Sequence, residues 1–389
     1  MSDTTLRWAW AEVDLAAVRH NVGELRRISA PADVWAVVKA DGYGHGAVDV
    51  ARAALDAGAA GLAVALVEEG VALRDAGLPG PILLLSQQPF EQLTELVAAE
   101  LTPTVYTAEY AAALSAVAVP GYPVHVKVDT GMQRVGVTDH AAAGFVADLA
   151  GVAPNLAVAG VFTHLACADE PSNPATPEQL DRFGAVLREL GRLGRRPPLV
   201  HAANSAGLLA WPGARHDLVR AGIALYGISP GHHVDDLATG LRPVLSLKAR
   251  VSHVKPVAAG SHVSYGWRHR FAAPTTVVTV PIGYADGVPR RLGSGPAGGE
   301  TGADVLVGGR RCPIVGVVTM DQLMVDVGDL PVRVGDEVVL IGSQGDEQIL
   351  ATDWADRLGT IAYEVVCGIS RRIARVSVDT DTDLGVRGT

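Results

Sequence analysis

The sequence is poor in cysteine and has no excess of positive charge, and each shortage excludes a class of protein. Its 389 residues include three cysteines, Cys167, Cys312 and Cys367, which lie far apart and form no C-x-x-C pair. This excludes a disulfide scaffold or a cysteine zinc site and fits a reducing compartment. Lys and Arg number 32 against 42 Asp and Glu, so the net charge of −10 argues against nucleic acid as the main partner.

Long hydrophobic runs are also missing. The first seven residues carry an acid and lack an apolar core, so no secretory signal is visible and we expect a cytoplasmic protein. The longest uncharged stretch, residues 149–168, is about as long as a membrane span, but Pro154, Asn155 and His164 interrupt it. We therefore expect no membrane partner. With 48% apolar and 19% charged residues, the composition is that of a soluble globular protein of two or three domains.

The first two thirds of the chain repeat one unit, in which a short aliphatic run, a turn and a stretch with helical spacing follow one another. The eight apolar runs are VWAVV (34–38), GLAVAL (61–66), PILLLS (81–86), LTPTVY (101–106), VHVKVD (124–129), LAVAGVFTH (156–164), PPLVHA (197–202) and LVRAGIALYG (218–227). This alternation predicts an α/β fold, a (β/α)8 TIM-type barrel over residues 1–242. A doubly wound open sheet would alternate similarly, although no G-x-G-x-x-G follows a strand.

After Arg242-Pro243 the pattern changes to short apolar or alternating segments separated by Gly, Pro and Asp turns. Residues 243–389 are therefore predicted to form a mostly-β domain, in which Thr352–Leu358 is the one segment that looks helical. The strand-like run Trp8–Val13 precedes the barrel and could join either domain.

A parallel barrel carries its active site at the carboxyl ends of its strands, which is where Lys39 lies. Because Lys39 follows VWAVV, its amine is expected in a partly desolvated mouth, and burial favours the neutral amine that condenses with carbonyls. A strand-end lysine that simply reaches solvent is the alternative. Glycines at positions 42, 44 and 46 favour the close approach of a ligand.

Polar residues follow the last strands as well. Arg220 lies inside LVRAGI, where it either forms a buried ion pair with Asp217 or Asp129 or donates to a ligand. Gly222-Ile223 stand where barrels bind phosphate through backbone N–H groups. Ser205 could add a hydroxyl to that phosphate or cap the helix that begins there.

His164 and His201 also stand at strand ends, and such histidines are more often structural than catalytic. Neither histidine lies in a metal-ligand spacing pattern, so we expect no metal site.

Taken together, the segments resemble the alanine racemases, pyridoxal-phosphate enzymes with a barrel and a β domain. The motifs that carry the resemblance over nearly the whole chain are AVVKADGYGHG (36–46), HVKVDTGMQRVG (125–136), FTHLACAD (162–169), HAANSAG (201–207), VRAGIALYG (219–227), VSYGW (263–267), PIGYADG (281–287), TMDQLMVDV (319–327) and AYEVVCGIS (362–370).

The resemblance implies a role for each site residue. Lys39 would bond to the cofactor and, with Tyr265, form the catalytic acid/base pair. The implied cofactor-binding residues are Lys39, Tyr43, His164, Ser205, Arg220, Gly222, Ile223 and Tyr363. Arg134 and the Met320 N–H would bind the substrate carboxylate. The implied entrance or outer-layer residues are Tyr284, Asp321, Lys127 and Asn204. Lys127 matches a position that is often carbamylated and then pairs with the arginine at 134.

The implied activity is interconversion of L-alanine and D-alanine, which supplies D-alanine for peptidoglycan, in a homodimer whose β domain provides Tyr265 and Met320 to the partner's site. Racemisation removes a proton from one face of the substrate and returns one to the other, so it needs two proton carriers. Arg220 keeps its proton, which leaves the pyridine nitrogen unprotonated and the ring a weaker electron sink.

Three alternatives stay open. A decarboxylase of the same architecture has a carboxylate facing the pyridine nitrogen and a late Cys-Asp signature, where this chain has Arg220 and Cys367-Gly. A broader serine/alanine racemase is commonly exported, and no signal is visible here. A non-catalytic cofactor carrier would need Lys39 but not Tyr265.

Overall fold

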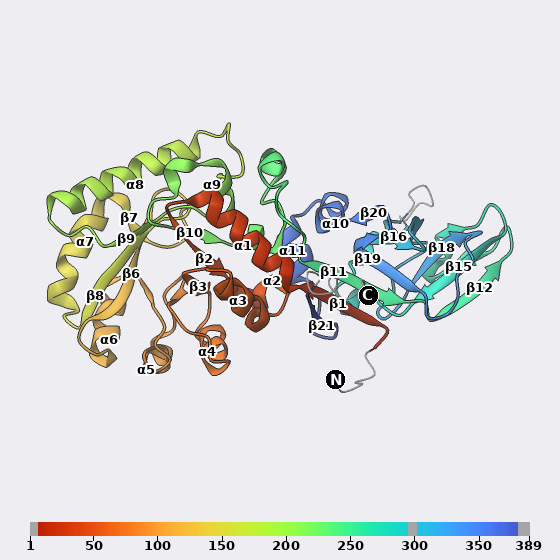
Figure 1. The fold of residues 1–389 in the computed structure, drawn as a ribbon, viewed down its shortest axis with the longest axis horizontal. Helices are drawn as coiled ribbons and strands as arrows, with labels where there is room; N and C mark the ends of the chain where they lie inside the picture. The colour runs from red at the N-terminus through yellow and green to blue at the C-terminus, as the bar shows by residue number, and fades with distance from the viewer. Residues whose placement is uncertain (1–6, 295–301, 380–389) are drawn as a thin grey trace, which may run out of the picture. The chain divides into compact units, whose positions relative to one another are not determined.

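The chain divides into two compact units (Figure 1). In the computed structural model residues 7–294 and 302–379 are described, and the first six residues, on which the expected absence of a signal partly rests, lie outside these ranges. One unit is Ala17–Arg242, and the other combines Met1–Ala16 with Pro243–Thr389. Within the described residues, no helix combines the length and the apolar character needed to cross a bilayer.

The strands of the first unit are parallel and form two hydrogen-bonded groups. One group has the order β10 (Leu218–Ala221), β2 (Asp33–Val37), β3 (Gly61–Val64) and β4 (Ile82–Leu84). The other has the order β5 (Thr104–Val105), β6 (Tyr122–Asp129), β8 (Leu156–Phe162) and β9 (Leu199–His201), and β7 (Val137–Thr138) pairs with β6.

Two sets of backbone contacts join these groups into a ring. A bridge between Leu83 and Thr102 links β4 to the start of β5. On the other side, the Asp217 N–H donates to the Val200 carbonyl and the Arg220 N–H to the Ala203 carbonyl, each at 3.0 Å. The sheet therefore closes, which confirms the predicted (β/α)8 barrel and excludes the open sheet.

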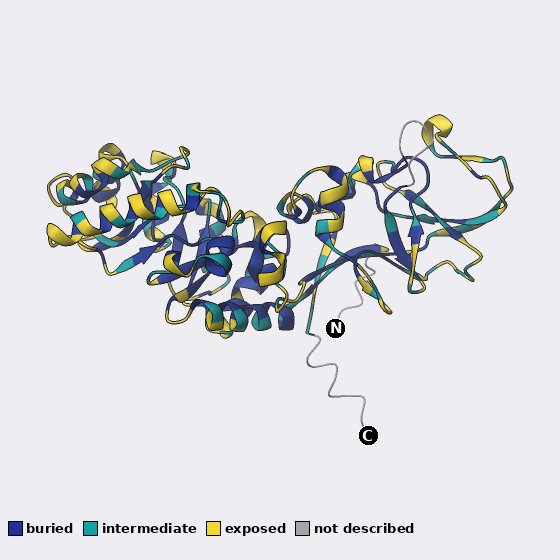
Figure 2. Cartoon of the chain, turned by 90° about the horizontal axis from the view of Figure 1, so that it is seen from above, coloured by how far each residue is buried: buried dark blue, intermediate teal, exposed yellow. Residues whose placement is uncertain are grey.

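Helices cover the outside of the barrel (Figures 1 and 2). They are α1 (Leu15–Ser29), α3 (Ala47–Asp56), α4 (Val67–Asp75), α5 (Leu93–Ala98), α6 (Ala108–Val117), α7 (Asp139–Val152), α8 (Ala175–Arg192) and α9 (Ser205–Ala210). In α8, Phe183, Val186 and Leu190 are buried, whereas Arg188 on another face is exposed. Apolar residues three or four positions apart thus form the stripe that packs on the strands.

The last predicted strand is shorter than expected. Residues 218–227 were predicted as one run, but β10 ends at Ala221, and Ile223–Tyr226 form a 3-10 turn (η3). The chain leaves the strand at Gly222, whose N–H donates to the hydroxyl of Ser205 at 2.9 Å. The turn thus directs the N–H groups of Gly222 and Ala224 toward the Ser205 hydroxyl.

The second unit is built around β1 (Ala9–Asp14), which pairs antiparallel with β11 (Leu245–Arg250) and parallel with β21 (Ala374–Val378). The sheet continues through β19 (Glu337–Gln344), β16 (Asp304–Val307) and β17 (Arg310–Pro313), and β20 (Glu347–Ile349) pairs with β19. A second sheet has the order β12 (His253–Val257), β15 (Thr275–Val280), β18 (Leu323–Gly328). The mostly-β prediction is confirmed.

Helices α10 (Ala351–Leu358) and α11 (Ala362–Cys367) complete this unit. The sequence predicted a helix at the position of α10 and missed α11. A helix of six residues is too short to show the repeating apolar pattern on which such a prediction depends.

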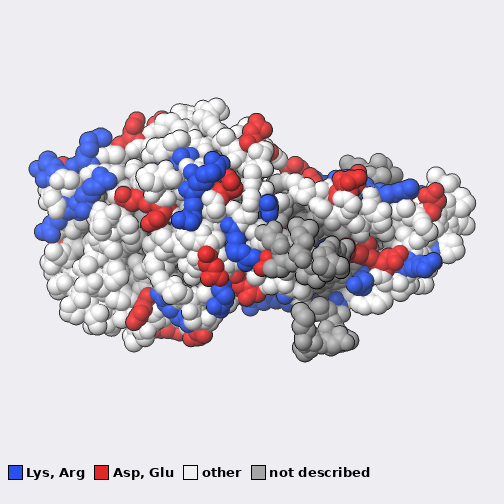
Figure 3. Space-filling view, viewed as in Figure 1, with Lys and Arg blue, Asp and Glu red and all other residues white. Residues whose placement is uncertain are grey.

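Charged side chains of both signs are interspersed over the face of the molecule in Figure 3. The full sequence carries a net charge of −10, and the expectation that nucleic acid is not the main partner stays a prediction.

Candidate active site

Lys39 lies at the carboxyl end of β2, where the chain enters a left-handed turn, α2 (Lys39–Tyr43). Ala40, Asp41, Gly42 and Tyr43 have φ angles between 52° and 63°. The Gly42 N–H donates to the Val38 carbonyl at 2.9 Å. A left-handed conformation costs about 1–2 kcal/mol for each residue that has a Cβ. The turn after the half-buried lysine is therefore strained and depends on its surroundings.

A polar cradle lies between the ends of β10 and β2. The Ser205 hydroxyl accepts hydrogen bonds from the N–H groups of Gly222 at 2.9 Å and Ala224 at 3.2 Å. A Cβ at Gly222 would lie 2.8 Å from the Tyr43 hydroxyl and 3.6 Å from Oγ of Ser205. Ile223 follows Gly222 and is buried. Hydroxyls and backbone N–H groups around a space that a Cβ would fill fit the phosphate of pyridoxal phosphate.

Ser205 is not the cap of the helix that follows it. The N-cap of α9 is Asn204, whose side-chain oxygen accepts from the Gly207 N–H at 2.9 Å. The alternative of a capping serine is therefore wrong, because the residue before it takes that role. The Ser205 hydroxyl is thereby left to contact the loop after β10.

Arg220 points into the barrel from β10 and is 3% exposed. Its Nη1 donates to Nδ1 of His201 at 2.8 Å. Its Nη2 donates to the carbonyls of Thr163 and Ala202, at 2.9 and 3.0 Å, and lies 3.3 Å from Nδ1 of His164. Burial lowers the pKa of Arg220 to about 9, so the guanidinium stays charged at neutral pH.

The buried ion pair expected as one alternative for Arg220 is wrong. The Asp217 carboxylate accepts from the Val200 N–H at 2.8 Å, and Asp129 accepts from the Gly131 N–H at 2.9 Å. Both carboxylates thus accept hydrogen bonds from nearby backbone N–H groups. Among the described residues neither forms an ion pair with Arg220.

The histidines beside Arg220 are neutral. A guanidinium can only donate, so Nδ1 of His201 accepts and its proton is on Nε2. Nε2 then donates to Nδ1 of His125 at 2.9 Å. Burial together with the charge of Arg220 lowers the pKa of His125 to about 4 and those of His201 and His164 well below 6.5. The sequence analysis gave His125 no role. A single histidine in an apolar strand does not show which residue it will contact in the folded protein.

Lys127 lies inside the barrel on β6 and is 5% exposed. Its Nζ is 5.5 Å from the ring centroid of Phe162, and the guanidinium carbon of Arg220 is 5.3 Å from the same centroid. Burial and the positive charges of Arg134, Arg220 and Lys39 lower the pKa of Lys127 to about 8. Arg134 is exposed on the loop between β6 and β7. The barrel mouth thus gathers several cations.

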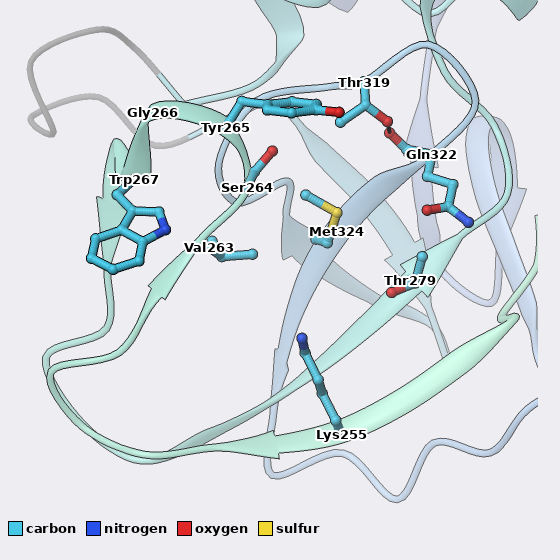
Figure 4. A pocket seen from close by; sticks show the side chains of 10 residues that line it. All are labelled: Lys255, Val263, Ser264, Tyr265, Gly266, Trp267, Thr279, Thr319, Gln322 and Met324. Atoms are coloured by element: carbon cyan, nitrogen blue, oxygen red, sulfur yellow. Dashed lines mark hydrogen bonds between the residues drawn. The ribbon is translucent and has the colours of Figure 1, made fainter.

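The other predicted site residues lie in the β unit. Tyr265 is at the tip of the hairpin β13 (His262–Val263) and β14 (His269–Arg270) and is 73% exposed. The Ser264 hydroxyl donates to the Val317 carbonyl at 2.8 Å and ties this tip to the neighbouring loop. Beside the Tyr265 ring lies a pocket of about 480 Å³, lined by residues that include Lys255, Gln322 and Met324 (Figure 4).

Tyr284, Met320 and Asp321 lie on two loops that are bonded to each other. The Tyr284 N–H donates to the Thr319 carbonyl at 2.9 Å. Tyr284 and Met320 are 43% and 53% exposed. Gly283 permits the close approach, because a Cβ there would collide with the carbonyls of Thr319 and Met320.

A buried carboxylate, Asp286, holds these loops, and sequence reasoning missed it although it lies in the PIGYADG motif. Arg7 binds it through two hydrogen bonds of 2.5 and 2.7 Å. Arg372 lies 3.3 Å from it and donates to Asp321 at 2.7 Å. Although burial alone would raise it, the pKa of Asp286 is lowered by the hydrogen bonds from Arg7 and Gly283. Tyr363 is half-buried on α11 of the same unit.

The described residues contain no group of three or more His, Cys, Asp or Glu side chains placed to hold a metal ion.

Replacing Gly222 by Ala should weaken cofactor binding. The new methyl group would lie 2.8 Å from the Tyr43 hydroxyl and occupy the cradle. We expect the dissociation constant for pyridoxal phosphate to rise about tenfold or more, a loss of about 1.4 kcal/mol, in titrations of apoprotein followed by visible absorption. Gly213→Ala, at a position with open space around it, is the control. Unchanged affinity in Gly222→Ala would show that the cradle is not the phosphate site.

Comparison with known proteins agrees with this geometry. A family model for the alanine racemase N-terminal domain matches residues 13–230, and one for the C-terminal domain matches residues 244–377. An alanine racemase of Symbiobacterium thermophilum is 50% identical over 377 residues, which cover 95% of this chain and 97% of the relative.

Two solved alanine racemases have similar structures. That of Streptomyces coelicolor A3(2) has 41% identity, a TM-score of 0.88 and coverage of 97% and 100% of the two chains. That of Bacillus anthracis with bound L-Ala-P has 39% identity, a TM-score of 0.87 and coverage of 96% and 95%. The chain belongs to the alanine racemase family.

Proposed function

We propose that the protein interconverts L-alanine and D-alanine, with Lys39 and Tyr265 moving protons on opposite faces of the substrate. Alanine racemases are pyridoxal-phosphate enzymes, and the barrel mouth has the groups to hold that cofactor. The observation that carries the proposal is the buried guanidinium of Arg220, which is bonded to neutral groups, on the strand that leads into the hydroxyl and N–H groups around Gly222. When bound, the cofactor supplies an electron sink that acidifies the α-proton of the amino acid.

Lys39 would hold the cofactor, with Tyr43, Ser205, Gly222 and Ile223 around its phosphate; for Tyr363 the same role rests on resemblance to the family alone. Arg220, positioned by His201 and His164, would face the pyridine nitrogen. With a pKa of about 9, Arg220 donates a hydrogen bond at neutral pH without surrendering a proton. A carboxylate in this place would instead keep that nitrogen protonated. The arrangement therefore favours reversible proton exchange over decarboxylation, which needs a stronger electron sink.

The substrate carboxylate would be bound by the Arg134 guanidinium and the Met320 N–H. Lys127, with its pKa near 8, is partly neutral at pH 7. A neutral amine adds carbon dioxide to form a carbamate and releases a proton. The resulting negative charge on Lys127 would pair with Arg134 and hold its side chain toward the substrate.

Tyr265 would act in the barrel of a second copy, in a homodimer with two shared sites. Its phenol is 73% exposed at a hairpin tip, and Met320 and Tyr284 are exposed on nearby loops, which supports insertion into another chain. Asp321, held by Arg372, would lie at the entrance with Tyr284. Cytoplasmic location and the supply of D-alanine for peptidoglycan rest on resemblance to the family.

The purified protein with pyridoxal phosphate should interconvert the two alanine enantiomers. Lys39→Ala should lower the rate in both directions by about 100-fold or more, because a positioned proton carrier contributes that much. The measurement follows D/L exchange by chiral chromatography over a panel of amino acids, with and without added cofactor. Faster exchange of serine than of alanine would make the protein a broader racemase, and no exchange of any amino acid would refute the proposal.

Mixing two inactive variants should restore activity if the sites are shared. A heterodimer of Lys39→Ala and Tyr265→Ala chains has one site with both groups intact and one with neither. With random pairing, half of the dimers are mixed, so about a quarter of the wild-type activity should return. Inactivity of heterodimers isolated by two affinity tags would show that Tyr265 does not serve the partner's barrel.

A further inference from the structure

We propose that Glu69 is a positioning residue for Lys39. Its carboxylate binds the peptide group directly after the lysine and keeps the left-handed turn in place. This inference rests on the proposed role of Lys39 and adds to it a residue outside the cofactor and substrate contacts.

Glu69 lies in the first turn of α4 and connects two loops at the barrel mouth. Its Oε1 accepts a hydrogen bond of 2.6 Å from the Ala40 N–H, in the loop after β2. Its Oε2 accepts from the N–H groups of Ala65 at 2.8 Å and Leu66 at 3.1 Å, in the loop after β3. The side chain therefore joins the loop that carries Lys39 to the end of the neighbouring strand.

The bond to Ala40 is not needed for capping α4. The bond from Leu66 to Oε2 satisfies the N–H group that precedes the helix, and Ala65 is bound by the same oxygen. Oε1 is thus directed at the turn alone. Glu68, in the same first turn, shares the favourable interaction with the helix dipole, but its carboxylate accepts from Nε2 of Gln92 at 2.7 Å instead.

The turn needs this support because Ala40 is its first left-handed residue. Ala40 and Asp41 have φ angles of 52° and 53°, which residues with a Cβ rarely adopt. Asp41 is held in its place by accepting from the Ala47 N–H at 3.0 Å. At the far end of the turn, the Tyr43 ring lies 5.0 Å from that of Tyr226. The Glu69 side chain comes from another element and binds the start of the turn.

Loss of this bond would let the peptide after Lys39 rotate toward an ordinary conformation and would displace the amine. A displacement of about 1 Å at a reacting group can lower a rate by about 100-fold. Substrate binding, which depends on other groups in the proposed site, would change much less. The effect should therefore appear in kcat and not in KM.

The test compares Glu69→Gln with Glu68→Gln in the cofactor-loaded enzyme. The amide that replaces the carboxylate in Glu69→Gln keeps one acceptor oxygen but presents an NH2 group to backbone N–H donors. We expect kcat to fall about tenfold or more, with KM within about twofold of wild type. We also expect faster hydrogen exchange in the peptide covering residues 39–47, measured by mass spectrometry. Glu68→Gln should change neither quantity.

Adding Ala40→Gly to Glu69→Gln should recover part of kcat and of the exchange protection, because glycine adopts the left-handed conformation without strain. This double variant also serves if Glu69→Gln alone does not fold. Wild-type kcat and exchange in Glu69→Gln, or equal losses in both single variants, would overturn the inference. If the wild-type chain does not racemise alanine, the proposed function fails. The comparison of hydrogen exchange in residues 39–47 still tests whether Glu69 keeps the turn in place.

Discussion

The polar groups inside the barrel are arranged around one interaction, the burial of the Arg220 guanidinium among neutral partners. Removing a charge from water is unfavourable unless other dipoles replace the water. Here two imidazoles, two carbonyls and the ring of Phe162 do so. Because the guanidinium only donates, it fixes the tautomer of His201, and this histidine in turn fixes His125. The positive charge is thus retained inside the barrel, where no carboxylate of the described residues pairs with it.

The cations near Arg220 are affected by the same two factors, burial and neighbouring positive charge. Lys127 and Arg220 both lie over the ring of Phe162, and the pKa of Lys127 falls because burial and neighbouring positive charge both oppose its protonation. The positive charges of Lys39 and Arg134 also lower the pKa of Lys127. A mouth with this charge suits a ligand that carries a phosphate and a carboxylate. Strand order explains the convergence, since parallel strands present their carboxyl ends at one side of a barrel.

Much of this could be predicted from the sequence. The alternation of apolar runs and helical stretches predicted parallel strands covered by helices, but it did not by itself separate a barrel from an open sheet. Polar residues at strand ends made Lys39 and Arg220 candidates, and only the family resemblance implied their roles. Close contacts were not predictable. Asn204 and Ser205 are both common caps, and the choice depends on where α9 begins. Nothing in ADGY indicates four successive left-handed residues. Glu69, one of two adjacent glutamates on a surface helix, has no local signal that it reaches Ala40.

The central claim is that neutral histidines hold the charge of Arg220, and nitrogen NMR of the protein labelled with 15N-histidine tests it most directly. The account predicts that His201 stays neutral, with its proton on Nε2, from pH 8 to pH 5. His125 should take up a second proton only near pH 4, the value to which burial lowers its pKa. Single His→Asn variants would assign the signals. A charged His201 at neutral pH, or one with its proton on Nδ1, would contradict the account.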